Sequence, residues 1–104
     1  MHKFLPLSTV EQFVPLMEEL GVSEVARSPR GFLTAYREAR GRSDRLVSYW
    51  WQKREAFIAR HVAQLRQRGE PLFELSRPTR RHLALIAWAY SPSPRAVTTF
   101  TRRL

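Results

Sequence analysis

Arginine is the residue type in this chain whose placement could do the most specific chemistry. Five arginines fall in the first turns of predicted helices, where the partial positive charge of a helix N-terminus disfavours them. Free backbone N–H groups together with guanidinium groups make a site for a phosphate or another anion. The sequence therefore predicts phosphate contacts from Arg30, Arg45, Arg80, Arg81 and Arg95.

Three consecutive aromatic residues, Tyr49, Trp50 and Trp51, lie within the longest predicted helix. Consecutive helical residues are rotated by about 100°, so the three cannot all face one core. Trp50 and Trp51 fit the apolar stripe of the helix, and core packing is the simplest interpretation of both. Tyr49 is left at the rim with Lys53 and Arg60, an arrangement that suits base stacking or contact with a protein partner.

Groups that would support catalysis or bind a metal are few. The chain has no cysteine, and capping of a helix accounts for its single aspartate, Asp44. The histidines, His2, His61 and His82, are not spaced as metal ligands, and the four glycines form no phosphate-binding loop. We therefore expect no enzyme activity, no catalytic residues, no metal and no cofactor.

The net charge of the 104-residue chain is +9, and it is distributed unevenly. Residues 1–26 carry one lysine against four glutamates, whereas residues 27–104 carry 17 basic and 5 acidic side chains. A field of this sign raises the local concentration of polyanions such as nucleic acid. Arginine makes bidentate hydrogen bonds to phosphates and guanine edges, which lysine cannot do, although a GC-rich genome would also favour arginine. The competing explanation of the arginines at helix starts is that they pair with the acidic segment 1–26 of the same chain.

Helix signals mark almost every segment boundary, and the alternation typical of β-strands is nearly absent. Ser8 to Glu11 has the spacing of a capping box, and Gly21 predicts the end of that helix. Pro15 inside the segment predicts a late start or a kink. Ser28-Pro29 and Gly41 predict the start and the end of the next helix.

The longest helix is predicted over about residues 44–68, capped by Ser43 and ended by Gly69. Arg54 and His61 fall inside its apolar stripe, and a buried arginine needs a partner. We expect a structural ion pair between Arg54 and one of three glutamates. The stripe consists of Val47, Trp51, Ile58, Val62 and Leu65, and the candidate partners of Arg54 are Glu18, Glu19 and Glu24.

Thr79 is predicted to cap a helix over about residues 80–90. The body of this helix, LALIAWAY, is apolar all round, which is typical of a central helix. A last helix is expected over about residues 94–103. The chain is thus predicted to be all-α, with about five helices in a single domain spanning residues 1–104.

Residues 83–104 resemble a helix-turn-helix unit. Ala87 takes the small position where the helices cross, and Val97 and Phe100 are the anchors of the second helix. The chain departs from the pattern at Ser91, where the turn glycine is expected, and at Pro92, where an apolar residue is expected. The resemblance implies that Arg95, Thr98, Thr99 and Arg102 face a DNA major groove, and Arg103 is included as a further nucleic-acid contact.

These features favour a small helical protein that binds nucleic acid, DNA rather than RNA. The alternative is an assembly or adaptor protein, such as a viral, virion or ribonucleoprotein component or an inhibitor of another protein, with self-association as one form. The N-terminus lacks a signal-peptide core, and the longest apolar run, at 83–90, is too short to span a bilayer. We therefore expect a cytoplasmic protein, or a virion component, without a membrane partner.

Overall fold

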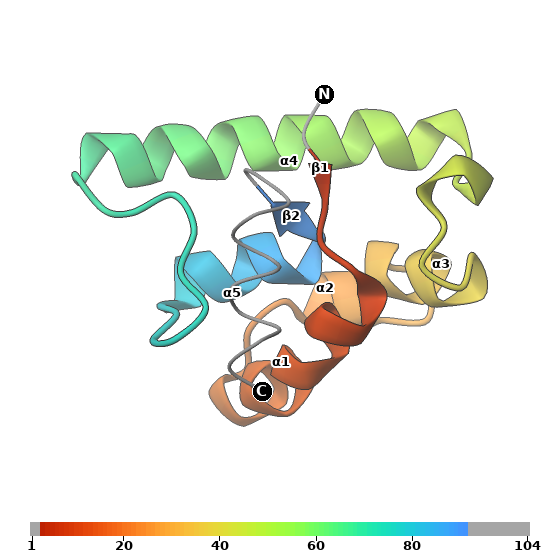
Figure 1. Cartoon of the computed structure of the whole chain (residues 1–104), viewed down its shortest axis with the longest axis horizontal. Coiled ribbons are helices and arrows are strands. Elements are labelled where there is room, and N and C mark those ends of the chain that lie inside the picture. Colours follow the sequence, from red (N-terminus) through yellow and green to blue (C-terminus); the bar gives the residue numbers. More distant parts are fainter. Residues whose placement is uncertain (1–2, 92–104) are drawn as a thin grey trace.

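The computed structural model describes residues 3–91, which are mostly helical (Figure 1). This confirms the all-α prediction. Two short strands, β1 (Lys3–Phe4) and β2 (Tyr90–Ser91), pair antiparallel. The helices are α1 (Leu7–Leu20), α2 (Glu24–Arg27), α3 (Phe32–Glu38), α4 (Ser48–Gln67) and α5 (Arg80–Ala87), with a 3₁₀ turn, η1 (Ser43–Arg45), before α4.

Helix α5 lies at the centre of the described structure. It contacts both α1 and α4, and Figure 1 shows α4 as a long rod along one edge with α5 beneath it. Leu83, Ile86 and Ala87 pack into the larger apolar cluster, which also includes residues of α1 and α3. Leu85 packs into a second cluster with Ile58 of α4. The prediction of a central apolar helix is therefore confirmed.

Helix α1 begins earlier than its predicted capping box. The carbonyl of Pro6 accepts hydrogen bonds from the backbone N–H groups of Thr9 and Val10, at 3.0 and 3.1 Å. No side chain caps this end, so the predicted capping box at Ser8 is wrong. Pro15 lies inside the helix and does not delay its start.

The predicted glycine stops are confirmed. Gly21, Gly41 and Gly69 follow α1, α3 and α4, with φ of 64°, 74° and 66°. This left-handed conformation is costly for residues that carry a Cβ atom, which favours glycine at these positions. Helix α3 itself ends at Glu38, and Arg40 already adopts a left-handed φ of 55° before Gly41.

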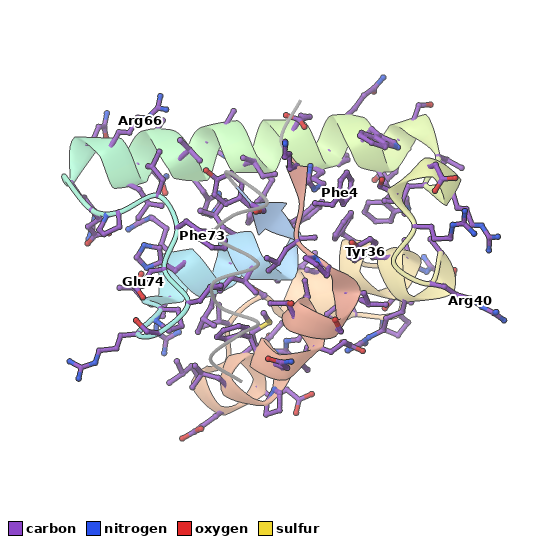
Figure 2. All side chains as sticks on the ribbon, viewed as in Figure 1. Phe4, Tyr36, Arg40, Arg66, Phe73 and Glu74 are labelled. Carbon is purple, nitrogen blue, oxygen red and sulfur yellow. The ribbon has the colours of Figure 1, made fainter. Side chains whose placement is uncertain are left out.

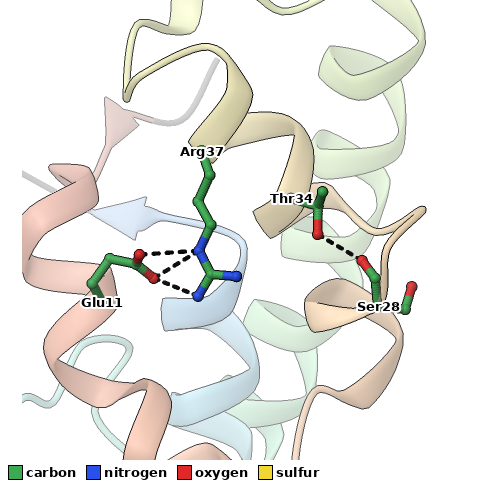
Figure 3. Close-up of polar contacts among 4 residues, drawn as sticks. All are labelled: Glu11, Ser28, Thr34 and Arg37. Carbon is green, nitrogen blue, oxygen red and sulfur yellow. Dashed lines mark hydrogen bonds and ion pairs between the residues drawn. The ribbon is translucent and has the colours of Figure 1, made fainter.

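The junction between α2 and α3 differs from the prediction of a helix start at Ser28. The hydroxyl of Ser28 donates to the carbonyl of Val25 at 2.7 Å, so it closes α2 instead of capping α3. The carbonyl of Ser28 accepts from the hydroxyl of Thr34 at 2.7 Å, a contact that joins α3 to this turn (Figure 3). Helix α3 starts after Gly31, where a Cβ atom would overlap the carbonyl oxygen of Val25.

Helix α4 also begins later than predicted. Ser43 opens the 3₁₀ turn η1, and the backbone is extended at Leu46 and Val47. Leu46 is buried, and its carbonyl accepts a hydrogen bond from the indole N–H of Trp51 at 3.2 Å, which fixes the entry into the helix. Val47 is 63% exposed and does not join the apolar stripe, whereas the other stripe residues are buried or half-buried: Trp51, Ile58, Val62 and Leu65.

Helix α5 ends at Ala87, before its predicted end at residue 90. Ala89 adopts a left-handed φ of 56°, and the chain then enters β2, where Tyr90 lies opposite Phe4. The N–H of Leu5 donates to the carbonyl of Ala89 at 2.6 Å and extends this pairing. The N-terminal segment therefore supplies backbone partners that end the helix, which local sequence does not reveal.

Arg54 is fully buried, as predicted, and it is held by backbone carbonyl groups. Its Nε donates to the carbonyl of Trp88 at 2.8 Å, and its Nη2 donates to the carbonyls of Lys3 and Ala89 at 2.6 and 2.8 Å. The guanidinium carbon lies 3.7 Å from the centre of the Phe4 ring. The arginine thus joins α4 to β1 and to the end of α5.

The predicted ion pair of Arg54 with Glu18, Glu19 or Glu24 is wrong. The carboxylate near its guanidinium belongs to the adjacent Glu55, with Nη1 and Oε1 3.6 Å apart. Burial lowers the pKa of Arg54 to about 10, and Glu55 partly opposes this shift. Backbone carbonyls can satisfy a buried guanidinium as well as side chains do, and nothing in a residue pattern indicates which carbonyls will converge.

Candidate nucleic-acid interface

The start of α5 is held by two reciprocal hydrogen bonds between Thr79 and His82. The hydroxyl of Thr79 accepts from the backbone N–H of His82 at 3.3 Å, and Nδ1 of His82 accepts from the N–H of Thr79 at 3.1 Å. The imidazole proton is therefore on Nε2, which donates to the carbonyl of Pro71 at 2.8 Å. The predicted cap at Thr79 is confirmed, and it fixes the turn that carries Arg80 and Arg81.

The connector between α4 and α5 is braced by Glu74. One carboxylate oxygen accepts from the N–H and the hydroxyl of Ser76, at 2.8 and 2.6 Å, and from the N–H of Arg77 at 3.2 Å. The side-chain hydrogen bond from Ser76 lowers the pKa of Glu74. Figure 2 shows Glu74 and Phe73 along this connector beside α5. These bonds fix the turn within the connector, and the hydrogen bond from His82 to the carbonyl of Pro71 joins the connector to α5.

A cleft opens where the first turn of α5 faces the C-terminal half of α4. Its volume is about 540 Å³. Nε of Arg81 donates to Oε1 of Gln64 at 3.0 Å and links the two helices. Arginine predominates among the charged groups of this basic cleft, whose lining is His61, Gln64, Arg68, Glu70, Thr79, Arg80, Arg81 and Ala84.

The arginines of the basic cleft form no ion pair with another residue in the range 3–91. Their charge is therefore available to an anion from solution. The acidic N-terminal segment instead pairs with Arg37 on α3, whose guanidinium is bound by both carboxylate oxygens of Glu11 (Figure 3). This hydrogen bonding raises the pKa of Arg37. Within the range, the ion pairs are Arg37–Glu11, Arg42–Asp44 and Arg54–Glu55.

Two of the predicted phosphate contacts do not stand at helix starts. Arg30 is exposed in the turn before Gly31, and Arg45 is the last residue of η1. These placements differ from the prediction because α3 and α4 begin later than expected. Neither residue lines the basic cleft, whereas Arg80 and Arg81 lie in the first turn of α5 as predicted.

The predicted C-terminal helix at about 94–103 lies outside the described residues. Of the helix-turn-helix resemblance, the structure describes the first helix, in which Ala87 is buried as the small position requires. That helix ends at Ala87 and is followed by β2, a departure from the expected pattern. Also outside the described residues are Arg95, Thr98, Thr99, Arg102 and Arg103.

Tyr49 lies on the exposed side of α4 and is 56% exposed, as predicted. Nζ of Lys53 lies 5.6 Å from the centre of its ring, a cation–π contact one turn along the helix. Arg60 is exposed but lies about three turns, or roughly 16 Å, further along α4, so it does not join this pair. Trp50 and Trp51 are half-buried against the larger apolar cluster, which confirms their core packing.

Three residues of the basic cleft, His61, Gln64 and Arg68, were not predicted as site residues. Their i, i+3, i+7 spacing places them on one face of a helix, so a signal was present in the sequence. His61 is half-buried and stacks on Phe57, with ring centres 3.9 Å apart. Burial lowers the pKa of His61, and the nearby Arg60 and Arg81 lower it further.

No cluster of His, Cys, Asp and Glu within residues 3–91 is suited to hold a metal ion. In the same part of the chain, no helix combines the length and the apolar character needed to cross a membrane. Comparison of the chain with protein-family models, with curated proteins and with solved structures gave no match.

Proposed function

We propose that this protein binds nucleic acid, without catalysing a reaction, and that the basic cleft holds the phosphates. The observation that carries the proposal is the convergence of Arg68, Arg80 and Arg81 on one open cleft, with no ion pair to another residue of 3–91. Arginine suits this role because its planar guanidinium binds two phosphate oxygens at once.

The position of Arg80 and Arg81 in the first turn of α5 supports a phosphate ligand. Each of these two cations lowers the stability of the helix by about 0.3–1 kcal/mol when no anion is bound at the helix start. A bound phosphate reverses that cost, because it contacts both the guanidinium groups and the free backbone N–H groups of the turn. The cap formed by Thr79 and His82 holds this turn in place before the ligand arrives.

DNA is the favoured ligand over RNA in this proposal, and the place of action is the cytoplasm or a virion. If residues 83–104 complete the helix-turn-helix unit, the segment 94–103 adds base contacts to the phosphate contacts of the cleft. This extension stays a prediction.

Fluorescence anisotropy with labelled oligonucleotides, single-stranded and duplex, tests the proposal. The double variant Arg80→Gln, Arg81→Gln should bind about tenfold more weakly. The slope of log affinity against log salt concentration should become shallower by about 1–2. The matched control, Arg30→Gln with Arg45→Gln, removes the same charge outside the cleft and should weaken binding only about twofold. Equal losses in the two variants would show a diffuse charge effect, and a wild-type protein that binds neither oligonucleotide at about 50 mM salt would disprove the proposal.

A second candidate function is that of an assembly or adaptor protein. The observation that favours it is a hollow of about 250 Å³ lined by the exposed Val47 and by Trp50, with the exposed Tyr49 edge-on to the Trp50 ring at 5.1 Å. Exposed aromatic and apolar side chains of this kind are common anchors of protein contacts. Sedimentation of the wild-type chain and of a Tyr49→Ser variant across a salt series tests for self-association, and a monomer under all conditions excludes it.

A further inference from the structure

Four rings from three separate parts of the chain stack in a continuous ladder. Phe32 of α3 stacks on Trp88, Trp88 on Phe57 of α4, and Phe57 on His61. The successive ring centres are 4.9, 4.8 and 3.9 Å apart, and the ring planes are tilted by 17°, 21° and 20°. His61 ends this ladder among the described residues, because no other described ring stacks on it.

A third hollow, the aromatic groove, runs along this ladder. Its volume is about 470 Å³, and Phe57, His61 and Trp88 supply its aromatic wall. Val25, which is 80% exposed, and Ala26 contribute further apolar surface from α2. The groove is therefore suited to a flat, apolar-faced ligand that stacks on or packs against rings.

The aromatic groove adjoins the basic cleft. His61 and Ala84 line both hollows, so the end of the ring ladder is also the point where the two spaces meet. A ligand that fills both must be anionic at one end and flat at the other. A nucleotide with an unpaired base has this chemistry, because its phosphate matches the arginines and its base matches the rings.

The wall of the groove also contains two polar residues. Ser23 and Glu24 lie in its wall beside the apolar side chains. The hydroxyl of Ser23 is buried and has no hydrogen-bond partner among the described residues, and the backbone at Ser23 is left-handed, with φ of 62°. Strained backbone clusters at active sites and ligand clamps, and a buried hydroxyl without a partner calls for an explanation of this kind.

Resting on the proposed function, we propose that this protein binds single-stranded nucleic acid, with an unpaired base in the aromatic groove and its phosphate in the basic cleft. A base inside a duplex is stacked on both faces and cannot enter the groove. Because burial lowers the pKa of His61, its ring is neutral at pH 7 and acts as a stacking surface, while the arginines supply the charge.

Three labelled probes with equal numbers of phosphates per strand test this inference by anisotropy: an oligothymidylate, an abasic oligonucleotide of the same length, and the corresponding duplex. The oligothymidylate should bind about tenfold tighter than the abasic strand and should quench tryptophan fluorescence. Equal affinity for these two strands overturns the inference but leaves phosphate binding intact. Tighter binding of the duplex also overturns it. Failure of all three probes to bind overturns the proposed function itself.

Variants of His61 locate the effect. His61→Ala removes the end of the ladder and should lower the affinity for oligothymidylate to that for the abasic strand. His61→Phe keeps a ring at the same place and should keep most of the preference for bases. Thermal unfolding of each variant shows that it is folded, and a preference that survives in a folded His61→Ala protein contradicts stacking at this position.

Discussion

Nη2 of Arg54 donates a hydrogen bond of 2.6 Å to the carbonyl oxygen of Lys3, across 51 positions of the chain. The same guanidinium binds the carbonyls of Trp88 and Ala89, so one side chain of α4 holds both β1 and the end of α5. The orientation of α5 relative to α4, and with it the geometry of the basic cleft, therefore depends on a residue that lies outside the cleft.

Replacement of Arg54 by methionine should destabilise the protein. Methionine fills part of the space but removes the hydrogen bonds that the guanidinium donates to the carbonyls of Lys3 and Trp88, at a cost of about 2–5 kcal/mol in the free energy of unfolding. Arg54→Lys should lose less stability, because an ammonium group keeps the charge and part of the hydrogen bonding but cannot reach all the carbonyls that the guanidinium binds. Urea unfolding measures both variants, and an Arg54→Met protein as stable as the wild type contradicts this role.

Gly31→Ala should be much more damaging than Gly69→Ala. At Gly31 the new methyl group would overlap the backbone carbonyl of Val25, so α2 and α3 would have to separate, at a cost of about 2–3 kcal/mol. At Gly69 the methyl group meets open space, and only the left-handed φ of 66° is unfavourable, by about 1 kcal/mol. Thermal denaturation compares the stability of the two variants. A similar loss of stability in both would show that the close approach of α2 and α3 at Gly31 does not add to the cost.

Ser23→Gly should stabilise the protein by about 1 kcal/mol. Glycine relieves the left-handed backbone and removes a buried hydroxyl without a hydrogen-bond partner, which outweighs the entropy that glycine adds to the unfolded chain. Ser23→Ala separates these effects, because it removes the hydroxyl but keeps the strain. The midpoint of urea unfolding gives both values, and a decrease in the glycine variant would run against the proposed strain.

The stability of the protein should fall as the pH is lowered below about 6.5, the pKa of histidine in an unfolded chain. The pKa of His61 is lower in the folded state, so the unfolded state binds the proton first. The stabilisation from a neutral His61 is therefore complete above that pH and is lost as the pH falls through the folded pKa. The difference in the free energy of urea unfolding between about pH 7.5 and pH 5 should be smaller in His61→Phe than in the wild type. A difference as large as that of the wild type would assign the pH dependence to other groups.

Local signals in the sequence predicted the features that depend on neighbouring residues. The glycine stops at Gly21, Gly41 and Gly69 and the cap at Thr79 are decided within one helical turn, and all are confirmed. The central place of α5 follows from its apolar residues, because a helix that is apolar over most of its surface must be largely buried. The exposed position of Tyr49 follows from helical periodicity in the same way.

Tertiary contacts decided what those local signals could not. Where α3 begins depends on the approach of Gly31 to Val25, and where α5 ends depends on pairing with the N-terminal strand. The partners of Arg54 are carbonyls from both ends of the described chain, and carbonyls carry no sequence signature. Composition determined that the chain is basic, and local signals indicated that it is helical. Only the crossing of α4 and α5 decided which arginines meet, because the cleft is formed by residues distant in sequence.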